Sequence, residues 1–276
     1  MTRKFYKMHG IGNDYIYFDC FEKELENPEA CARVLSDRRR SIGGDGIILV
    51  LPSKIADAKM RIFNADGSEG KMCGNGIRCV GKFLREIKGI QKNVLSVETL
   101  SGVKTLYFTD DSTSVTVDMG APVFRPSEIP TLLKGEKIID YPLVVDGTQY
   151  NITCLSMGNP HCVVFCDDVA SLDLNALGPS FEKNPVFPDG VNTEFVQMIS
   201  ERELKMRVFE RGSGETFACG TGACAAVVAA VERGFCLKNT PVAVHLRGGT
   251  LTIKDTNETV FLTGDAELSF IGTVTL

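Results

Sequence analysis

The sequence predicts a mixed α/β protein that is built from two copies of one structural unit. Residues 59–76, KMRIFNADGSEGKMCGNG, return without a gap as KMRVFERGSGETFACGTG at residues 205–222, an offset of 205 − 59 = 146 residues. Short β-type runs surround both stretches, and a helical segment follows each Cys-Gly-x-Gly. A chain of 276 residues is long enough for two domains. The same offset pairs Gly12-Asn13 with Gly158-Asn159, and Gly44 with Gly190.

The strands are predicted from short runs of β-branched, aromatic and aliphatic residues that are bounded by turn residues. In the first copy these runs are KFYKMH, YIYFDCF, GIILVL, KMRIF, VLSVET, VKTLYF and SVTVDM. In the second copy they are YNITCLSM, HCVVFC, EFVQMI, LKMRVF, PVAVHL, TLTIK and TVFLTG. This alternation of many short strands with few helices is typical of an α/β or α+β fold.

Two helices are predicted, over residues 76–88 and about 222–233. Apolar residues recur at helical spacing in the first segment and nearly fill the second, so we expect the first helix to be half exposed and the second to be deeply buried. Each predicted helix ends at a glycine, Gly89 or Gly234, as helix stop signals require.

The repeat also predicts where the domains begin and end. We expect an N-terminal domain over residues 1–119 and a C-terminal domain over residues 120–265, with GAPVFRPSEIP at 120–130 as the linker. The last segment has no counterpart in the first copy at this offset. We therefore expect residues 266–276 to cross back to the N-terminal domain.

The composition predicts a soluble, globular, cytoplasmic protein. Hydrophobic residues make up 43% of the chain, charged residues 24%, and the net charge is −5, which argues against disorder and against nucleic-acid binding. We interpret the short basic run at residues 38–40 as a solvated turn. The basic N-terminus has no apolar stretch after it, and the longest apolar segment, 223–231, has about half of the roughly 20 residues that a membrane helix needs. We expect neither a secretory signal nor membrane association.

The ten cysteines predict free thiols, with neither disulfides nor a metal site. Disulfide-rich scaffolds are usually short and secreted, whereas this chain is long and has no export signal. There is no C-x-x-C pair, and the histidines are scattered. We expect most of the cysteines to be small buried apolar residues: Cys20, Cys31, Cys154, Cys162, Cys166, Cys224 and Cys236.

Cys73 and Cys219 differ from the others because each lies at a predicted helix start. The unpaired N–H groups and partial positive charge of a helix N-terminus favour the thiolate over the thiol, whose pKa is ordinarily near ~8.5. The glycines that follow let backbone N–H groups approach a carboxylate closely. If the two copies face each other, one sulfur could remove the α-proton of a bound amino acid while the other returns a proton to the opposite face. Such an inversion needs no pyridoxal cofactor. The alternative is that each cysteine is only a small residue in a crowded turn.

Five motifs resemble diaminopimelate epimerase: HGIGNDY at 9–15, FNADGSEGKMCGNGIRC at 63–79, SMGNPH at 156–161, VNTEF at 191–195 and ERGSGETFACGTGACA at 210–225. The resemblance implies two similar α/β domains, each a barrel-like sheet around a central helix, with the active site in the cleft between them. It implies interconversion of L,L- and meso-diaminopimelate without cofactor or metal, in lysine and peptidoglycan precursor synthesis. It also suggests a homodimer.

The resemblance also implies roles for individual residues. Cys73 and Cys219 would be the acid/base residues, assisted by His161 and Glu210. The substrate α-carboxylate would bind the N–H groups of Gly74, Asn75, Gly220 and Thr221. An arginine for the second carboxylate, with amide and acid groups for the second ammonium, is what recognition of diaminopimelate requires. The residues expected to line this pocket are Asn13, Asn64, Asn159, Asn192, Glu210 and Arg211.

Two departures from the family pattern bear on substrate choice. Lys71-Met72, before Cys73, replace a segment that often ends in glutamine. Gly46 stands where some members carry a glutamine, and a loosened pocket would allow side activity on a smaller amino acid such as glutamate. A proline-type racemase is a second hypothesis, but it gives Arg211 no obvious role. An isomerase of the phenazine-pathway type lacks this cysteine pair. A non-catalytic amino-acid-binding protein and a Cys73–Cys219 redox sensor also stay open.

Overall fold

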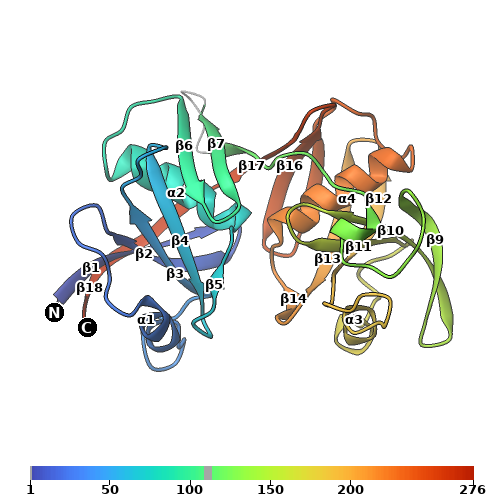
Figure 1. Ribbon diagram of the computed structural model, residues 1–276, viewed down its shortest axis with the longest axis horizontal. Coiled ribbons are helices and arrows are strands. Elements are labelled where there is room, and N and C mark those ends of the chain that lie inside the picture. Colours follow the sequence, from blue (N-terminus) through green and yellow to red (C-terminus); the bar gives the residue numbers. More distant parts are fainter. Residues whose placement is uncertain (1, 109–113) are drawn as a thin grey trace. The chain divides into compact units, whose positions relative to one another are not determined.

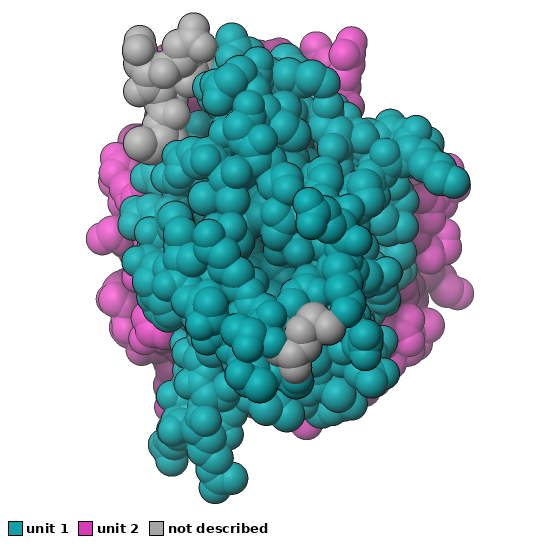
Figure 2. All heavy atoms as spheres, turned by 90° about the vertical axis from the view of Figure 1, so that its left-hand side faces the viewer, with its two compact units in different colours: residues 1–118, 263–276 teal, residues 119–262 magenta. Residues whose placement is uncertain are grey.

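The computed structural model describes residues 2–108 and 114–276, which form two compact units (Figure 1). Unit 1 comprises residues Met1–Asp118 and Thr263–Leu276, and unit 2 comprises Met119–Leu262. Figure 2 distinguishes the residues of the two units by colour. The boundaries between the units therefore lie at 118/119 and 262/263, within three residues of those expected from the repeat.

Unit 1 is a curved sheet around one buried helix. Neighbouring strands pair in the order β18, β1, β2, β3, β4, β6, β7, β8, and the pairs β2–β3 and β4–β6 are parallel. Helix α2 packs against β1, β2, β8 and β18. The bounds are β1 Thr2–Gly10, β2 Asn13–Asp19, α1 Pro28–Leu35, β3 Gly46–Leu51, β4 Ala58–Asn64, β5 Glu69–Gly70, α2 Gly74–Glu86, β6 Val94–Thr99, β7 Gly102–Phe108, β8 Ser114–Asp118 and β18 Glu267–Thr275.

Unit 2 has the same arrangement around helix α4. Its strands pair in the order β9, β10, β11, β12, β13, β15, β16, with β11–β12 and β13–β15 parallel. Helix α4 packs against β10, β11, β12 and β16. The bounds are η1 Pro126–Glu128, β9 Ile138–Val145, β10 Thr148–Ser156, β11 Pro160–Phe165, α3 Leu174–Glu182, β12 Asn192–Ser200, β13 Glu203–Glu210, β14 Gly214–Thr216, α4 Gly220–Glu232, β15 Val242–Leu246 and β16 Gly249–Asp255. Strand β17, Val260–Asp265, begins in unit 2 and ends in unit 1.

The sequence repeat is thus a repeat of structure, and the predicted fold class is confirmed. Shifted by 146 residues, β1 becomes β10 and α2 becomes α4 with the same bounds. The strand that completes each unit comes from a different part of the chain. In unit 1 the C-terminal strand β18 pairs with β1, whereas in unit 2 the preceding strand β9 pairs with β10.

The prediction that the first helix is half exposed is wrong. Every residue from 74 to 81 is buried, as are Phe83 and Leu84, so α2 is as enclosed as α4. The polar residues Asn75 and Arg78 gave the sequence the pattern of a surface helix, yet both side chains are buried. Both helices also begin two residues earlier than predicted, directly after Cys73 and Cys219.

Two short outer helices and three strands, β5, β9 and β14, were not predicted. Helix α1 packs against β3 and β4, and α3 packs against β12, β13 and β14. The segment LNALGPSFE of α3 carries a glycine and a proline, which in sequence resemble a turn, but Asp173 caps this helix by accepting hydrogen bonds from the N–H groups of Asn175 and Ala176. Strand β9 was also missed, and the expected linker at 120–130 holds η1 and a bridge between Val123 and Ser156.

Within residues 2–108 and 114–276 we find no helix of the length and apolarity that a membrane span requires.

The backbone around Gly46 leaves no room for any side chain. A Cβ atom built there would lie 2.1 Å from the carbonyl oxygen of Phe63 on the paired strand β4. A glutamine could replace this glycine only if the two strands moved apart. Gly46 is therefore a requirement of the β3–β4 pairing in this protein, and its presence does not by itself enlarge a pocket.

We predict that Gly46→Ala lowers the free energy of unfolding by about 3 kcal/mol, because the added methyl group overlaps backbone that cannot yield. Gly70→Ala is the matched control, since its new Cβ would lie 3.2 Å from Ile62 Cγ2, the end of a side chain, and 4.0 Å from its next neighbours. Urea unfolding followed by circular dichroism measures both variants. Equal stability of the two variants would contradict the assigned crowding.

Candidate functional site

Each predicted catalytic cysteine caps the central helix of its own unit. Cys73 precedes α2 and accepts a hydrogen bond at Sγ from the N–H group of Gly76 at 3.3 Å. Cys219 precedes α4 and accepts one from Gly222 at 3.4 Å. A helix N-terminus leaves its first N–H groups without intrahelical partners, so each unit combines a sulfur with backbone donors suited to an anion.

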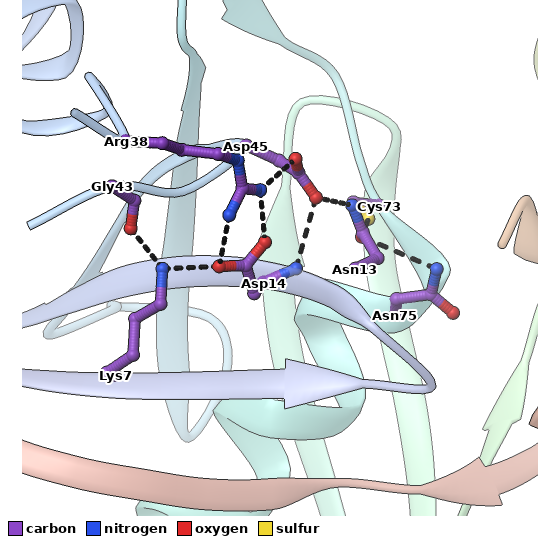
Figure 3. Close-up of polar contacts among 8 residues, drawn as sticks. All are labelled: Lys7, Asn13, Asp14, Arg38, Gly43, Asp45, Cys73 and Asn75. Carbon is purple, nitrogen blue, oxygen red and sulfur yellow. Dashed lines mark hydrogen bonds and ion pairs between the residues drawn. The ribbon is translucent and has the colours of Figure 1, made fainter. Parts of the chain in front are cut away.

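In unit 1, Asn13 connects Cys73 to the rest of the cluster (Figure 3). The Oδ1 atom of Asn13 lies 3.4 Å from Cys73 Sγ and 3.4 Å from Asn75 Nδ2. Its Nδ2 atom donates to Asp45 Oδ2 at 2.7 Å. Because an ionised carboxylate only accepts hydrogen bonds, Asp45 fixes the amide orientation of Asn13 and turns its oxygen toward the cysteine.

A network of charged side chains holds Asp45 in place. Arg38 Nη2 lies 2.8 Å from Asp45 Oδ1 and 2.5 Å from Asp14 Oδ1. Lys7 Nζ approaches Asp14 Oδ2 at 2.5 Å and also donates to the carbonyl of Gly43. Burial raises the pKa of Asp14, but hydrogen bonds from Arg38 and Lys7 outweigh it and hold this pKa below its ordinary value. Arg38 is therefore part of the structure behind Cys73. The predicted solvated turn is confirmed as well, since residues 38–40 form an exposed turn and the Arg38 side chain is 57% exposed.

The strand topology brings the predicted asparagines to the same end of each sheet. In unit 1, Asn13 begins β2 and Asn64 ends β4, which is antiparallel to β3. Asn64 donates from Nδ2 to Ser68 Oγ in the β4–β5 turn at 3.0 Å. In unit 2, Asn192 begins β12 and Glu210 ends β13, while Asn159 directly precedes β11. The polar residues therefore gather at strand ends in both copies.

Unit 2 contains a fully buried histidine–glutamate pair that sequence reasoning missed in part. His161 Nδ1 lies 2.7 Å from Glu194 Oε1, and His161 Nε2 lies 2.9 Å from Asn159 Oδ1. The side chains of His161 and Glu194 are both 0% exposed. Burial raises the pKa of Glu194, and His161 acts in the opposite direction. Glu194 lies within the motif VNTEF. An acidic residue in an otherwise apolar predicted strand was the signal in the sequence that could have identified it as a candidate site residue.

The surroundings of Cys219 favour the thiol. The side chain is buried, and burial raises its pKa well above the ordinary value, with further upward contributions from Glu210 and Glu194. Two hydrogen bonds lower the pKa of Cys219 but are weaker. One joins Sγ to Thr221 Oγ1 at 3.5 Å, and the other comes from the Gly222 N–H group. Our expectation that the helix start makes Cys219 a thiolate is therefore wrong for this free protein, because desolvation and two carboxyl groups outweigh the helix terminus.

Backbone and side-chain contacts place the remaining predicted residues of unit 2. Asn192 Oδ1 accepts the N–H of Arg211 at 2.8 Å. The exposed Arg211 donates from Nη1 to the carbonyl of Asp189 at 2.9 Å. Glu210 accepts a hydrogen bond from Thr216 Oγ1. The predicted N–H donors Gly74, Asn75, Gly220 and Thr221 all lie in the first turns of α2 and α4. Unit 1 thus collects Asn13, Asn75 and Cys73 in direct contact, and unit 2 collects His161 with Asn159.

We predict that Asp45→Ala lowers the pH midpoint of Cys73 alkylation by less than about one unit. Without Asp45 the Asn13 amide can rotate and present its NH₂ group to the sulfur, which stabilises the thiolate. Iodoacetamide labelling with peptide mass spectrometry measures Cys73 and Cys219 separately. Asp37→Ala is the control, because Asp37 accepts from the N–H groups of Arg39 and Arg40 in the same loop. An unchanged Cys73 midpoint in folded Asp45→Ala protein would contradict this role.

Comparisons with known proteins agree with the fold and the motifs. A family model described as diaminopimelate epimerase matches residues 5–125 and 153–269. The diaminopimelate epimerase of Acetivibrio thermocellus is 48% identical over 278 residues, which cover 99% of each chain. Among solved structures, a phenazine biosynthesis protein of the PhzF family from Bacillus anthracis aligns with a TM-score of 0.73 at 16% identity over 100% of both chains. A probable proline racemase from Agrobacterium radiobacter aligns with a TM-score of 0.73 at 16% identity, over 99% of this chain and 93% of its own. The two structural likenesses concern the fold.

Proposed function

Because the chain belongs to the diaminopimelate epimerase family, we propose that it interconverts L,L- and meso-diaminopimelate by proton transfer between two cysteines. The observation that carries the proposal is the pair of matched cysteine caps, Cys73 on α2 and Cys219 on α4, in a chain that is 48% identical to such an enzyme across its length. The proposal requires both sulfur atoms to reach the same α-carbon. The reaction would serve lysine and peptidoglycan precursor synthesis in the cytoplasm.

In the proposed reaction one thiolate removes the α-proton and the other thiol delivers its proton to the opposite face. The electron pair of the broken C–H bond moves onto the α-carboxylate as the carbanion forms, and it returns to the carbon when the second S–H bond breaks. The N–H groups of Gly74, Asn75, Gly220 and Thr221 would stabilise that charge, because helix N-termini favour anions. His161 and Glu210 would assist the exchange of protons with solvent.

Recognition of the distant amino-acid group falls to polar residues at the strand ends. A guanidinium offers five N–H donors, and one of those of Arg211 bonds the Asp189 carbonyl, so a second carboxylate can be held by others. The second ammonium group needs acceptors, which the carboxylate of Glu210 and the amide oxygens of the asparagines can supply. In our proposal Asn13, Asn64, Asn159 and Asn192 complete this part of the pocket.

The test is α-proton exchange in deuterated water under reducing conditions. We expect L,L-diaminopimelate to gain deuterium at one α-carbon and to appear as the meso isomer. Cys73→Ala and Cys219→Ala should each lower the inversion rate by a factor of about 10² to 10⁴, since each removes an acid/base group. Cys31→Ala, which changes a half-buried thiol on α1, is the control and should retain activity.

Absence of both exchange and inversion in the unmodified protein would end the proposal. A binding protein that only holds the amino acid should keep its ligand after either cysteine is replaced, so calorimetry on the same variants separates the two functions. A redox sensor would gain activity on oxidation and lose it with reductant. Including glutamate and proline in the substrate panel tests side activity on smaller amino acids and the proline-type alternative.

We further propose that the enzyme is a homodimer formed through β18. This strand pairs with β1 along one edge, and its residues Phe270 and Ile271 are 49% and 47% exposed. Exposed apolar side chains on a terminal strand favour association with another chain. We expect Phe270→Asp to convert a dimer into a monomer in light scattering coupled to gel filtration, whereas Leu132→Asp on unit 2, also exposed, should not. A monomeric unmodified protein would contradict the assignment.

A further inference from the structure

The two halves differ most clearly in buried charge beneath their central helices. At the 146-residue offset Ile48 corresponds to Glu194, and Arg78 corresponds to Cys224. A Cβ built at Gly76 would lie 2.7 Å from Ile48 Cδ1, and one built at the equivalent Gly222 would lie 2.6 Å from Glu194 Oε1. The same position under the first helical turn therefore holds a methyl group in unit 1 and a carboxyl oxygen in unit 2.

Unit 1 carries a buried cation beneath α2. The Arg78 side chain is 0% exposed; its Nη1 donates to the Gly74 carbonyl at 3.1 Å, and its Nε to the Asp265 carbonyl at 3.3 Å. Its Nη2 has no hydrogen-bond partner among the residues the structure describes, and a Cβ at Gly10 would lie 2.7 Å from it. Burial lowers the pKa of Arg78, yet a guanidinium starts so far above neutral pH that it stays charged.

Two titratable neighbours of Cys73, Cys79 and Tyr17, are neutral at pH 7. Burial raises the pKa of Cys79 to about 11, and burial raises that of Tyr17, on β2, well above its ordinary value. The charge of Arg78 is therefore not cancelled by either neighbour. Asp265, whose carbonyl accepts from Arg78 Nε, also brings a carboxyl group that stabilises this cation. A thiolate at Cys73 would add a further negative charge beside Arg78, in a region where Coulomb interactions are weakly screened.

Unit 2 presents the opposite charge to its cysteine. Glu194 Oε1 and Cys219 Sγ both lie against Gly222, at 2.6 Å and 3.2 Å from the position of a Cβ there. Glu194 Oε2 is buried and has no hydrogen-bond partner in the described part of the chain. Glu210 adds a second carboxyl group, and Cys162, whose pKa burial raises well above normal, adds no charge. His161 can at most neutralise Glu194, so no net positive charge faces Cys219.

We propose that Arg78 and Glu194 set the resting protonation states of the two cysteines, with Cys73 held as the thiolate and Cys219 as the thiol. Both are positioning residues that act through a cysteine, and the proposal rests on the proposed epimerase function. One neutral group favours the thiol form of Cys73. The S–H group of Cys73 donates to Asn13 Oδ1, with Sγ and Oδ1 3.4 Å apart. A long S–H bond to a neutral oxygen is weaker than the attraction between a buried cation and a thiolate.

The assignment gives the catalytic cycle a direction. The free enzyme is ready for the stereoisomer whose α-hydrogen faces Cys73. After one turnover Cys73 carries the proton and Cys219 is the thiolate, which its carboxyl neighbours disfavour. The enzyme must then lose a proton from Cys73 and take one up at Cys219 before it can process the same isomer again.

The test is the pH dependence of alkylation at each cysteine in the substrate-free, full-length protein. Iodoacetamide reacts with the thiolate, and peptide mass spectrometry reads the two sites separately. In the unmodified protein we expect the midpoint for Cys73 to lie below that for Cys219. Arg78→Met should raise the pH midpoint of Cys73 alkylation by about one unit, so that alkylation below the midpoint becomes about tenfold slower. Arg78→Lys should largely preserve the midpoint. Lys82→Met is the control, since Lys82 lies on the same helix and pairs with Glu86.

The variant Glu194→Gln keeps the shape of the side chain and provides an independent test of the proposal in unit 2. It should lower the Cys219 midpoint and leave that of Cys73 unchanged, whereas Glu203→Gln, beside His245, should move neither. The proposal is overturned if folded Arg78→Met and Glu194→Gln leave both midpoints in place, or if Cys219 is the more acidic thiol. These measurements need no substrate. If the epimerase assay fails while the alkylation midpoint of Cys73 still lies below that of Cys219, the proposed function is refuted and the charge assignment is not.

Discussion

Each unit is organised by the N-terminus of a buried helix. Helices α2 and α4 are enclosed by strands over nearly their whole length, so their first N–H groups need hydrogen-bond partners, and the capping sulfur supplies one in each unit. Glycine at positions 76 and 222 accommodates the side chains of Ile48 on β3 and Glu194 on β12, whose end atoms lie within 3 Å of where a Cβ would be and would have to shift for a larger residue. The Cys-Gly-x-Gly pattern therefore fits the packing and leaves backbone N–H donors suited to an anion at the same place.

The strand topology supplies the rest of the site at that end of the helix. Strands β2 and β3 are parallel and β3 and β4 antiparallel, so the start of β2 lies on the same side as the end of β4. Strands β11, β12 and β13 repeat the arrangement in unit 2. A side chain at a strand end is less constrained by the sheet than one in its interior, and this is where the asparagines and Glu210 stand. The duplicated topology explains why polar residues recur at equivalent positions without being identical.

Sequence patterns sufficed for the parts of the fold that depend on local rules. The strand runs, the internal repeat and the cysteines at helix starts follow from periodicity, turn residues and capping, and they agree with the structure. The enclosure of α2 could not be predicted, because Asn75 and Arg78 resemble surface residues until the surrounding strands are known. The same holds for the Asp45–Arg38 contact behind Asn13 and for Glu194 beside His161. Each depends on partners that are distant in sequence, as do the burial and carboxyl groups that keep Cys219 protonated.

The divergence of the two copies matters for any reaction that needs one protonated and one ionised cysteine. If both thiols had the same pKa and titrated independently, the mixed state would reach at most about half of the molecules, and only at one pH. Separated pKa values make the mixed state dominant over the whole range between them. A duplicated backbone alone provides two equivalent helix termini, so the separation must come from side chains that differ between the copies. Arg78 in one unit and Glu194 in the other are buried ionisable side chains, one basic and one acidic, beneath the first turns of the two helices.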